Sequence, residues 1–213
     1  MFGFLNVYKP KGITSHDVVS VLRRITKVKQ IGHTGTLDPF AEGVLPICIG
    51  KATRLIEYLD DDKAYTGTIQ LGSSTTTYDL EGEEVNFSDK KVTLNEIEAA
   101  LDKFRGEIEQ LPPIYSAIKV NGKKLYEYAR EGKEVKIEPR RVNISKLEIL
   151  EYDETSRRLT LHIECSKGTY IRSIAHDLGT ELTTFGYLVK LVRVKAGMFE
   201  VNNAVSLEHI QTK

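Results

Sequence analysis

One aspartate, Asp38, is the residue of this sequence best suited to chemistry, because it lies at the centre of a glycine-rich stretch, Gly32–Gly43. Three glycines and Pro39 within a dozen residues exclude a helix interior and predict a loop of fixed shape. The apolar run Val44–Ile49 predicts a short buried strand that would hold this loop rigidly. A carboxylate that is held ionised there can act as a nucleophile or a base without a metal ion. The alternative is that Asp38 only caps a turn, since Asp-Pro is common turn chemistry.

The sequence lacks the common motifs for phosphate, metal and serine chemistry. The glycines around Gly32 do not match Gly-x-Gly-x-x-Gly, and those after Gly43 have the wrong spacing for a P-loop. None of the five histidines forms His-Glu-x-x-His, and Gly-x-Ser-x-Gly is absent. Cys48 and Cys165 lie far apart in apolar, strand-like runs, which favours buried thiols in a reducing cytosol over a disulfide. We therefore expect no metal site.

Two further features could take part in chemistry or binding. Arg172 is predicted in the first turn of a helix, on the side away from the apolar stripe. An arginine there opposes the helix dipole, which is typical of a functional requirement, and a surface arginine is the alternative. Between Lys119 and Arg141 basic residues outnumber acidic ones, with Tyr126 and Tyr128 interleaved. This pattern suits a surface that follows an RNA backbone and stacks bases, and a solvated face of mixed charge is the alternative.

Hydrophobic periodicity predicts the elements that must position these residues. Apolar runs predict strands over Gly3–Tyr8, Val44–Ile49, Ala64–Leu71, Val142–Tyr152, Arg158–Ser166 and Tyr187–Val194. Helical spacing and caps predict helices from Thr14 or Ser15 to Lys27, over Ala52–Leu59, after the capping box of Thr93 and Glu96, over Leu125–Arg130, from Thr169 through Leu178, and from Ser206. The segments Gly72–Gly82 and Gln110–Ala117 are expected to be irregular. The Asn-Gly dipeptide within Lys119–Lys124 predicts a hairpin turn. Because strands outnumber helices and often adjoin in sequence, we expect an α+β fold with a mixed, mainly antiparallel central sheet and flanking helices.

Composition limits the classes of protein that this chain can represent. Its 213 residues suit one domain, or one domain with a small insertion. Thirty basic residues balance thirty acidic ones, so a nucleic-acid site would have to be a local basic surface. The N-terminus lacks the features of a signal peptide, and no apolar run is long enough to span a bilayer. We therefore expect a cytoplasmic protein with no membrane partner.

The stretch Gly32–Pro46, with Asp38 at its centre, resembles the catalytic motif of the TruB family of tRNA pseudouridine synthases. Further segments resemble motifs of the same family in the expected order, namely Lys9–Gly12, Lys63–Tyr65, Gln110–Lys119, and Cys165–Ser173 with Asp177–Gly179. The similarity covers nearly the whole chain, and dispersed motifs make it specific. It implies the pseudouridine synthase fold.

The resemblance implies that the chain converts uridine 55 in the TΨC loop of tRNA to pseudouridine, without a cofactor or a metal. Asp38 would be the catalytic aspartate, which either attacks the nucleotide or removes a proton from its sugar. The uracil would leave its N-glycosidic bond, turn within the closed site and rejoin through C5. A closed site is needed so that the detached base cannot escape and water cannot enter.

The same resemblance implies roles for other residues. Tyr65 would stack on the flipped base and help to remove the C5 proton, while Arg172 would pair with Asp38 and hold it ionised. His33 would help to extract the uridine, and such contacts must offset a few kcal/mol of unstacking. The remaining positions implied to bind substrate or support the site are Asp79 near the base, Tyr170 in the arginine motif, Leu191 as a wall of the pocket, and Lys9 and Pro10 beneath the site.

By this resemblance, residues 1–213 form a pseudouridine synthase catalytic domain with an RNA-clasping insertion around residues 119–141. The expected partner is the T arm of tRNA, and a monomer is the default expectation. Family members usually continue into a C-terminal RNA-binding PUA domain. Only a few residues follow the last predicted strand here, so we expect that domain to be absent from this chain.

Three other functions stay open at the level of sequence. A non-catalytic RNA-binding or tRNA-folding protein would not need Asp38, Tyr65 and Arg172 together, and an Asp38→Asn substitution separates it from an enzyme. A hydrolase of a sugar bond would need a second carboxylate across the bond. Glu42 is the nearest candidate, but a neighbour on the same loop is poorly placed for that task. A guide-RNA-dependent synthase of the same family is the third function, although such enzymes typically carry the terminal domain.

Overall fold

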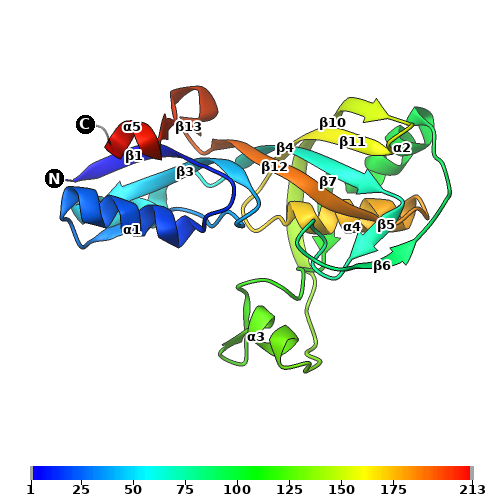
Figure 1. Ribbon diagram of the computed structural model, residues 1–213, viewed down its shortest axis with the longest axis horizontal. Helices are drawn as coiled ribbons and strands as arrows, with labels where there is room; N and C mark the ends of the chain where they lie inside the picture. The colour runs from blue at the N-terminus through cyan, green and yellow to red at the C-terminus, as the bar shows by residue number, and fades with distance from the viewer. Residues whose placement is uncertain (1, 212–213) are drawn as a thin grey trace. The chain divides into compact units, whose positions relative to one another are not determined.

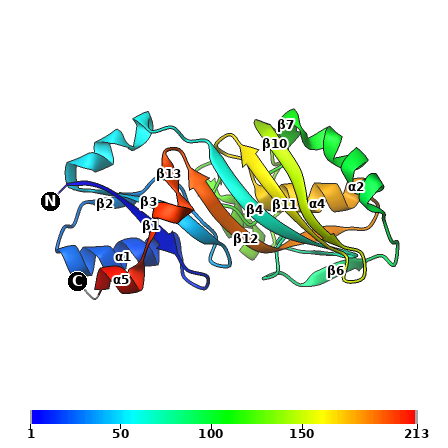
Figure 2. The same ribbon diagram turned by 90° about the horizontal axis from the view of Figure 1, so that it is seen from above.

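The computed structural model describes residues 2–211, which form two compact units (Figures 1 and 2). The first unit holds the residues up to Thr66 and those from Lys190 on, and the second holds Gly67–Val189. Two strands, β4 (Lys63–Leu71) and β12 (Gly186–Ala196), contribute residues to both units.

The first unit is a mixed sheet with helices packed against it. Its other elements are β1 (Gly3–Lys9), α1 (Ser15–Thr26), β2 (Ile31–His33), β3 (Glu42–Ile49), a 3₁₀ helix (Gly50–Tyr58), β13 (Phe199–Glu200), a short 3₁₀ turn (Val201–Asn203), β14 (Val205–Ser206) and α5 (Leu207–Gln211). The strand order is β14-β1-β3-β12, with β2 paired to β3 and β13 paired to β12. The β1–β3, β2–β3 and β12–β13 pairs are antiparallel, whereas β1–β14 and β3–β12 are parallel.

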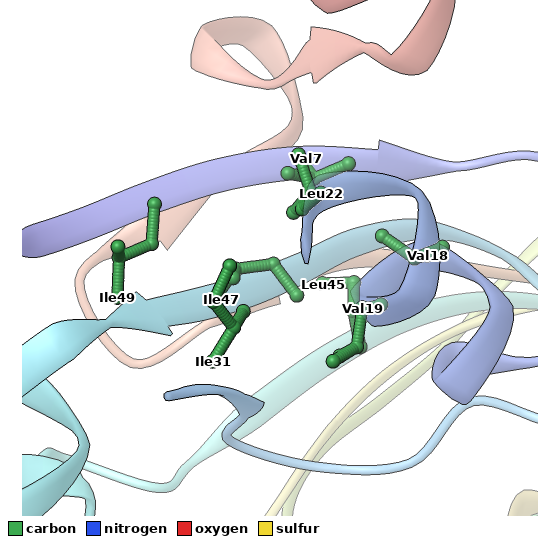
Figure 3. Packing of buried hydrophobic residues seen from close by; sticks show 8 residues of the cluster. All are labelled: Val7, Val18, Val19, Leu22, Ile31, Leu45, Ile47 and Ile49. Atoms are coloured by element: carbon green, nitrogen blue, oxygen red, sulfur yellow. The ribbon is translucent and has the colours of Figure 1, made fainter. Parts of the chain in front are cut away.

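Helix α1 packs its apolar face against this sheet. Figure 3 shows the resulting cluster, which consists of Val7, Val18, Val19, Leu22, Ile31, Leu45, Ile47 and Ile49. A capping box fixes the start of the helix, because the Thr14 side chain accepts a hydrogen bond from the Asp17 N–H and the Asp17 carboxylate accepts one from the Thr14 N–H. The cap thereby fixes the first helical residue, Ser15, which contacts the loop after β2.

The second unit continues the antiparallel pattern. Its elements besides β4 and β12 are β5 (Ser73–Thr75), β6 (Glu84–Phe87), α2 (Leu94–Leu101), a 3₁₀ turn (Asp102–Phe104), β7 (Gly106–Gln110), β8 (Lys119–Val120), β9 (Lys123–Lys124), α3 (Leu125–Arg130), β10 (Arg140–Asp153), β11 (Arg158–Cys165) and α4 (Ile171–Glu181). The strand order is β4-β11-β10-β7, and β10 is antiparallel to both of its neighbours. Helix α2 contacts β10 and α4 (Figure 2). The β8–β9 hairpin and α3 project from this unit's sheet (Figure 1).

The predicted fold class is confirmed, because the strand pairs are mixed and mainly antiparallel and helices flank them. The Asn121-Gly122 turn of the β8–β9 hairpin also agrees with its sequence signal. Both residues have positive φ, 51° and 80°, as the favoured two-residue hairpin turn requires.

Two predictions of local structure were correct only in part. A helix was predicted over Ala52–Leu59 and one is present there, but it is a 3₁₀ helix, Gly50–Tyr58, in which only Ala52 is buried. Helices owe most of their stability to a packed apolar face, which is small here. The predicted loop Gly72–Gly82 contains β5, whose three hydroxyl residues are buried and paired with β6. These side chains show no apolar alternation, so periodicity could not reveal the strand.

Candidate active site

The loop between β2 and β3 in the first unit carries Asp38 and is fixed on both sides of this residue. Ser15 Oγ accepts a hydrogen bond from the Leu37 N–H at 2.9 Å and lies 3.1 Å from the Leu37 carbonyl oxygen, to which it donates. On the other side, the Gly12 N–H donates to the Pro39 carbonyl at 2.8 Å. Asp38, whose side chain is half-buried, therefore belongs to a rigid turn.

Lys9, the last residue of β1, is fully buried against this loop. Its Nζ donates to the carbonyl oxygens of Pro10 at 2.9 Å, Ile13 at 2.6 Å and Pro39 at 3.4 Å. Burial lowers the pKa of Lys9 to about 8, although the nearby negative charge of Asp38 acts in the opposite direction. Lys9 thus joins three backbone positions and places an amine near the Asp38 carboxylate.

The lowered pKa of Lys9 predicts a measurable pH dependence of stability. Below about pH 8 the side chain is charged in both the folded and the unfolded chain, whereas from about 8 up to 10.5 only the unfolded chain keeps the proton. The unfolded chain then binds more protons, so the wild type gains stability relative to Lys9→Met as the pH rises, by up to about 1.4 kcal/mol per pH unit. Urea unfolding of both proteins between pH 7 and pH 10 measures this difference.

The exposed Lys29 supplies the matched control for that measurement. The difference between the wild type and Lys29→Met should not change over the same pH range. A difference between the wild type and Lys9→Met that is flat or falls with pH would contradict the lowered pKa of the buried Lys9 amine.

Arg193 in β12 lies against the same loop, although the sequence analysis did not single it out. Its side chain is 1% exposed. Nε donates to the Val44 carbonyl at 2.8 Å, and the two terminal nitrogens donate to the carbonyls of Gly35 at 3.1 Å and Thr36 at 3.4 Å. These carbonyls lie on both sides of Asp38 in the chain, so one guanidinium holds both ends of the Asp38 loop.

The close approach of β12 to the start of β3 requires a glycine at position 43. Arg193 is opposite Gly43 in the parallel β3–β12 pair. Gly43 has φ 111°, and a Cβ at this position would lie 2.2 Å from the Arg193 carbonyl oxygen. Strand phase could have revealed Arg193, because it follows the buried Leu191 by two residues and therefore lies on the same face of β12.

The other predicted residues of the first unit come from its strands. His33 ends β2, and its buried Nδ1 has no hydrogen-bond partner within residues 2–211. Burial, together with the neighbouring charge of Arg193, lowers the pKa of His33, so the ring is neutral near pH 7. Tyr65 in β4 and Leu191 in β12 are both buried.

In the second unit, Arg172 of α4 is buried and contacts three groups. Its Nε lies 3.7 Å from Asp79 Oδ2, and its terminal nitrogens donate to the carbonyls of Thr77 and Tyr115, each at 3.1 Å. The alternative of a surface arginine is therefore wrong, since the side chain is 5% exposed. The apolar stripe of α4 was identified correctly, but the segments that carry Thr77 and Tyr115 also cover the side that holds Arg172.

Asp79 is held in place by neighbours on its own loop. Its Oδ1 accepts hydrogen bonds from Thr77 Oγ1 at 2.6 Å and from the Glu81 N–H at 2.9 Å. The second oxygen, Oδ2, faces Arg172. The side chain is buried, so the ion pair is shielded from water.

Tyr170 directly precedes α4 and joins it to the irregular segment Gln110–Ala117. The Gln110 side chain accepts a hydrogen bond from the Tyr170 N–H at 2.8 Å and donates to the Tyr170 carbonyl at 3.0 Å. Ser173 Oγ donates to the Leu111 carbonyl at 2.7 Å. The segment that reaches Arg172 through the Tyr115 carbonyl is therefore fastened to the start of the same helix.

Comparison with known proteins gives the chain a family. Residues 23–171 match the family model described as TruB family pseudouridylate synthase (N terminal domain). The chain belongs to the TruB family. The tRNA pseudouridine synthase B of Clostridium novyi (strain NT) is 50% identical over 213 residues, which cover 100% of this chain and 73% of that relative. The protein of the same name from Staphylococcus haemolyticus (strain JCSC1435) is 47% identical over 98% of this chain and 70% of its own length.

Solved structures share the fold of this TruB-family chain. The crystal structure of a Cbf5-Nop10-Gar1 complex contains a chain with a TM-score of 0.76 and 30% identity, covering 97% of this chain and 53% of that chain. A structure of an H/ACA RNP bound to a substrate RNA containing 2′-deoxyuridine contains a chain with a TM-score of 0.73 and 27% identity. The match covers 97% of this chain and 51% of that chain. The TruB-family chain thus spans about half the length of these solved chains.

The predicted site residues of this TruB-family chain fall into two groups. The first unit holds Lys9, Pro10, His33, Asp38, Tyr65 and Leu191, and the second holds Asp79, Tyr170 and Arg172. Lys9 contacts the Asp38 loop within the first group, and Asp79 pairs with Arg172 within the second. Among residues 2–211, no cluster of histidine, cysteine, aspartate and glutamate could hold a metal ion, and Cys48 and Cys165 are buried. The described helices are all too short or too polar to cross a membrane.

Proposed function

We propose that this chain is the catalytic domain of a tRNA pseudouridine synthase that isomerises uridine 55 in the TΨC loop. The observation that carries the proposal is Asp38 on a loop fixed at both neighbouring residues, in a chain 50% identical over its length to a tRNA pseudouridine synthase B. The names of the relatives supply tRNA as the substrate, and the motif resemblance supplies position 55. We further propose that the chain acts as a cytoplasmic monomer on the T arm.

In this proposal the Asp38 carboxylate acts on the ribose of the target uridine, either by attack on the sugar or by removal of a sugar proton. The bond between the sugar and N1 of uracil breaks, the base turns, and C5 bonds to the same sugar carbon. In the first route the bond between Asp38 and the sugar then breaks, and in the second Asp38 returns the proton to the sugar, so the free carboxylate is restored in both. C5 loses a proton and N1 gains one, so the substrate and the product have the same composition. No electrons are gained or lost overall, and the reaction therefore needs no redox cofactor.

The charges in each unit suit this role. The amine of Lys9 and the guanidinium of Arg193 contact the backbone of the Asp38 loop, and positive charge there favours an ionised carboxylate. We infer that Arg172 pairs with Asp38 during catalysis. Asp79 would then hold the guanidinium from its other side, which agrees with their 3.7 Å ion pair.

The target base must leave its stack before it can react, at a cost of a few kcal/mol. We assign this extraction to His33, whose neutral ring and buried Nδ1 are suited to contact with a nucleotide. Tyr65 would stack on the flipped base and help to remove the C5 proton. Leu191 would form an apolar wall that keeps water from the detached uracil.

The RNA-clasping insertion (residues 119–141) would bind the T arm through its cations. In the structure three of these cations lie over tyrosine rings, with distances to the ring centroid of 5.3 Å for Lys124–Tyr126, 5.2 Å for Arg130–Tyr126 and 5.0 Å for Lys123–Tyr128. The tyrosines are thus engaged by cations of their own segment and help to hold them in place. Phosphate contacts by these cations account for binding better than base stacking does.

Lys124→Gln and Arg130→Gln are each expected to weaken binding of T-arm RNA and to make it less dependent on salt. Each lost phosphate contact should reduce the slope of log K against log salt by about 1. Fluorescence anisotropy with labelled T-arm RNA between 50 and 200 mM KCl measures the slope. Lys103→Gln, an exposed lysine of the same unit, is the control and should leave the slope unchanged. Slopes that stay at the wild-type value in both insertion variants would contradict the assignment.

Incubation with an unmodified T-arm stem-loop, followed by carbodiimide mapping of pseudouridine, tests the proposed function. We expect one pseudouridine at the position of uridine 55. Release of free uracil would instead indicate a hydrolase, and binding without either product would indicate a non-catalytic RNA-binding protein. A requirement for an added guide RNA would indicate the guide-dependent class.

A further inference from the structure

Next to the Arg172–Asp79 pair, two aromatic rings of the second unit are stacked. The ring centroids of Tyr78 and His176 are 3.8 Å apart, and the ring planes differ by 11°. His176 follows Arg172 by four residues on α4, so the two side chains leave the same side of the helix on successive turns. Tyr78 lies between Thr77 and Asp79, and both of these contact Arg172. Helix α4 therefore holds one short segment in two ways, through charge and through stacked rings.

The backbone of Tyr78 is in the left-handed region, with φ 65°. Residues with a Cβ rarely adopt this conformation, and glycine or asparagine is the usual choice. Backbone hydrogen bonds hold the turn, because the Tyr78 N–H donates to the Thr75 carbonyl at 3.3 Å and the Leu188 N–H donates to the Tyr78 carbonyl at 3.0 Å. A tyrosine at such a position indicates that its ring makes a contact that offsets the strain. The stack on His176 is that contact.

The stack also accounts for the orientation of the His176 ring. Burial lowers the pKa of His176, so the imidazole is neutral near pH 7. Its buried Nδ1 makes no hydrogen bond to any residue that the structure describes. The ring of Tyr78 is thus the contact that fixes the imidazole on this side.

We propose that the Tyr78–His176 stack is a positioning device for Arg172. The stack stabilises the left-handed turn, and this turn sets the Thr77 carbonyl and the Asp79 carboxylate on the guanidinium. Because Asp79 Oδ1 is already bound within its own loop, the direction of Oδ2 follows the backbone at Tyr78. Tyr78 and His176 act through Arg172 and are positioning residues, and their effect on rate rests on the proposed function.

Four substitutions in the full chain separate the parts of this device. Tyr78→Ala removes the ring and keeps the strained backbone, whereas Tyr78→Gly removes both the ring and the strain. His176→Ala removes the stacking partner, whereas His176→Phe keeps a ring there. With T-arm RNA as substrate, we expect Tyr78→Ala and His176→Ala to lower kcat about tenfold with little change in KM, because they misplace a reacting group without removing an RNA contact. Tyr78→Gly should lose less than Tyr78→Ala, and His176→Phe should recover most of the rate.

The combination of the two alanine substitutions gives the sharpest outcome. The double variant should lose no more activity than either single variant, because each change removes the same contact. Wild-type kcat in His176→Ala, or losses that multiply in the double variant, would overturn the proposal. Tyr58→Ala, which removes an exposed ring from the first unit, controls for the loss of a tyrosine. Each variant is assayed at a temperature below the midpoint of its own thermal unfolding.

A second readout does not depend on turnover. The NMR signal of the Arg172 Nε–H, assigned by its loss in Arg172→Lys, should exchange slowly with water in the wild type and in His176→Phe. It should exchange faster in Tyr78→Ala and His176→Ala, because the guanidinium is then less firmly held. If the wild type forms no pseudouridine, the proposed function fails, and this signal still decides whether the stack holds Arg172. An unchanged signal in both alanine variants would overturn the proposal.

Discussion

Replacing Asp38 with asparagine is expected to abolish pseudouridine formation while T-arm RNA still binds. Asparagine has nearly the same shape, so the turn fixed at Leu37 and Pro39 should persist. It cannot ionise, however, and can neither attack the sugar nor take a proton from it. Loss of a group that forms or breaks bonds typically lowers kcat by about 10⁴-fold or more. Single-turnover assays with labelled T-arm RNA measure the rate, and anisotropy measures the binding.

Asp17 offers a matched control for this experiment, because it is an exposed aspartate of the same unit that accepts a hydrogen bond from the Thr14 N–H. Asparagine can accept the same hydrogen bond, so Asp17→Asn should keep the wild-type rate and lose at most about 0.5 kcal/mol of stability. A variant Asp38→Asn that forms pseudouridine at the wild-type rate would refute the enzyme mechanism. Loss of RNA binding in Asp38→Asn would show that the carboxylate acts in binding instead.

Arg193→Met is expected to impair both stability and catalysis, which distinguishes it from Asp38→Asn. The substitution leaves the carbonyls of Gly35, Thr36 and Val44 without their common donor, at a cost of about 2–4 kcal/mol in the free energy of unfolding. The loop would then relax, and a displacement of Asp38 by about 1 Å would lower kcat about 100-fold. Urea unfolding measures the first effect, and single-turnover assays at a temperature where the variant stays folded measure the second.

Two further variants show whether the geometry of the guanidinium matters. Arg193→Lys keeps the charge, but one ammonium cannot reproduce the fork that reaches three carbonyls, so its activity should lie between those of the wild type and Arg193→Met. Arg24→Met, at an exposed arginine of α1, should change stability by no more than about 0.5 kcal/mol. Full activity in folded Arg193→Met would show that the loop keeps its shape without this residue.

Much of the fold could be predicted from the sequence because its signals are local. The start of α1 followed from the two candidate caps Thr14 and Ser15. In the structure the cap is Thr14, whose reciprocal hydrogen bonds with Asp17 form a capping box. The hairpin turn followed from Asn121-Gly122, since few other dipeptides adopt its backbone angles. The central antiparallel strands followed from the alternation of apolar residues in segments such as Arg158–Cys165.

The parts that could not be predicted depend on contacts between distant segments. Arg172 was assigned to the polar side of its helix, because helical periodicity does not reveal that Thr77 and Tyr115 cover that side. Strand phase places Arg193 on the buried face with Leu191, but it was overlooked since a single arginine in a strand usually points to solvent. Its partners are the carbonyls of Gly35 and Val44, and backbone acceptors leave no trace in a sequence. The motif resemblance supplied the candidate residues, and the packing shows how they are held.

The parallel pairing of β3 and β12 has a consequence for insertions and deletions. Arg193 reaches the Asp38 loop only because it lies opposite Gly43 in this pair. Loss of one residue between Leu188 and Val192 would bring Val194 opposite Gly43, and gain of one would bring Val192 there, so either change turns the guanidinium toward the other side of the strand. A single-codon deletion there should therefore be more harmful than most substitutions at the same positions. Among natural variants of this gene, length changes should be missing from this part of β12 and tolerated at the Asn121-Gly122 turn.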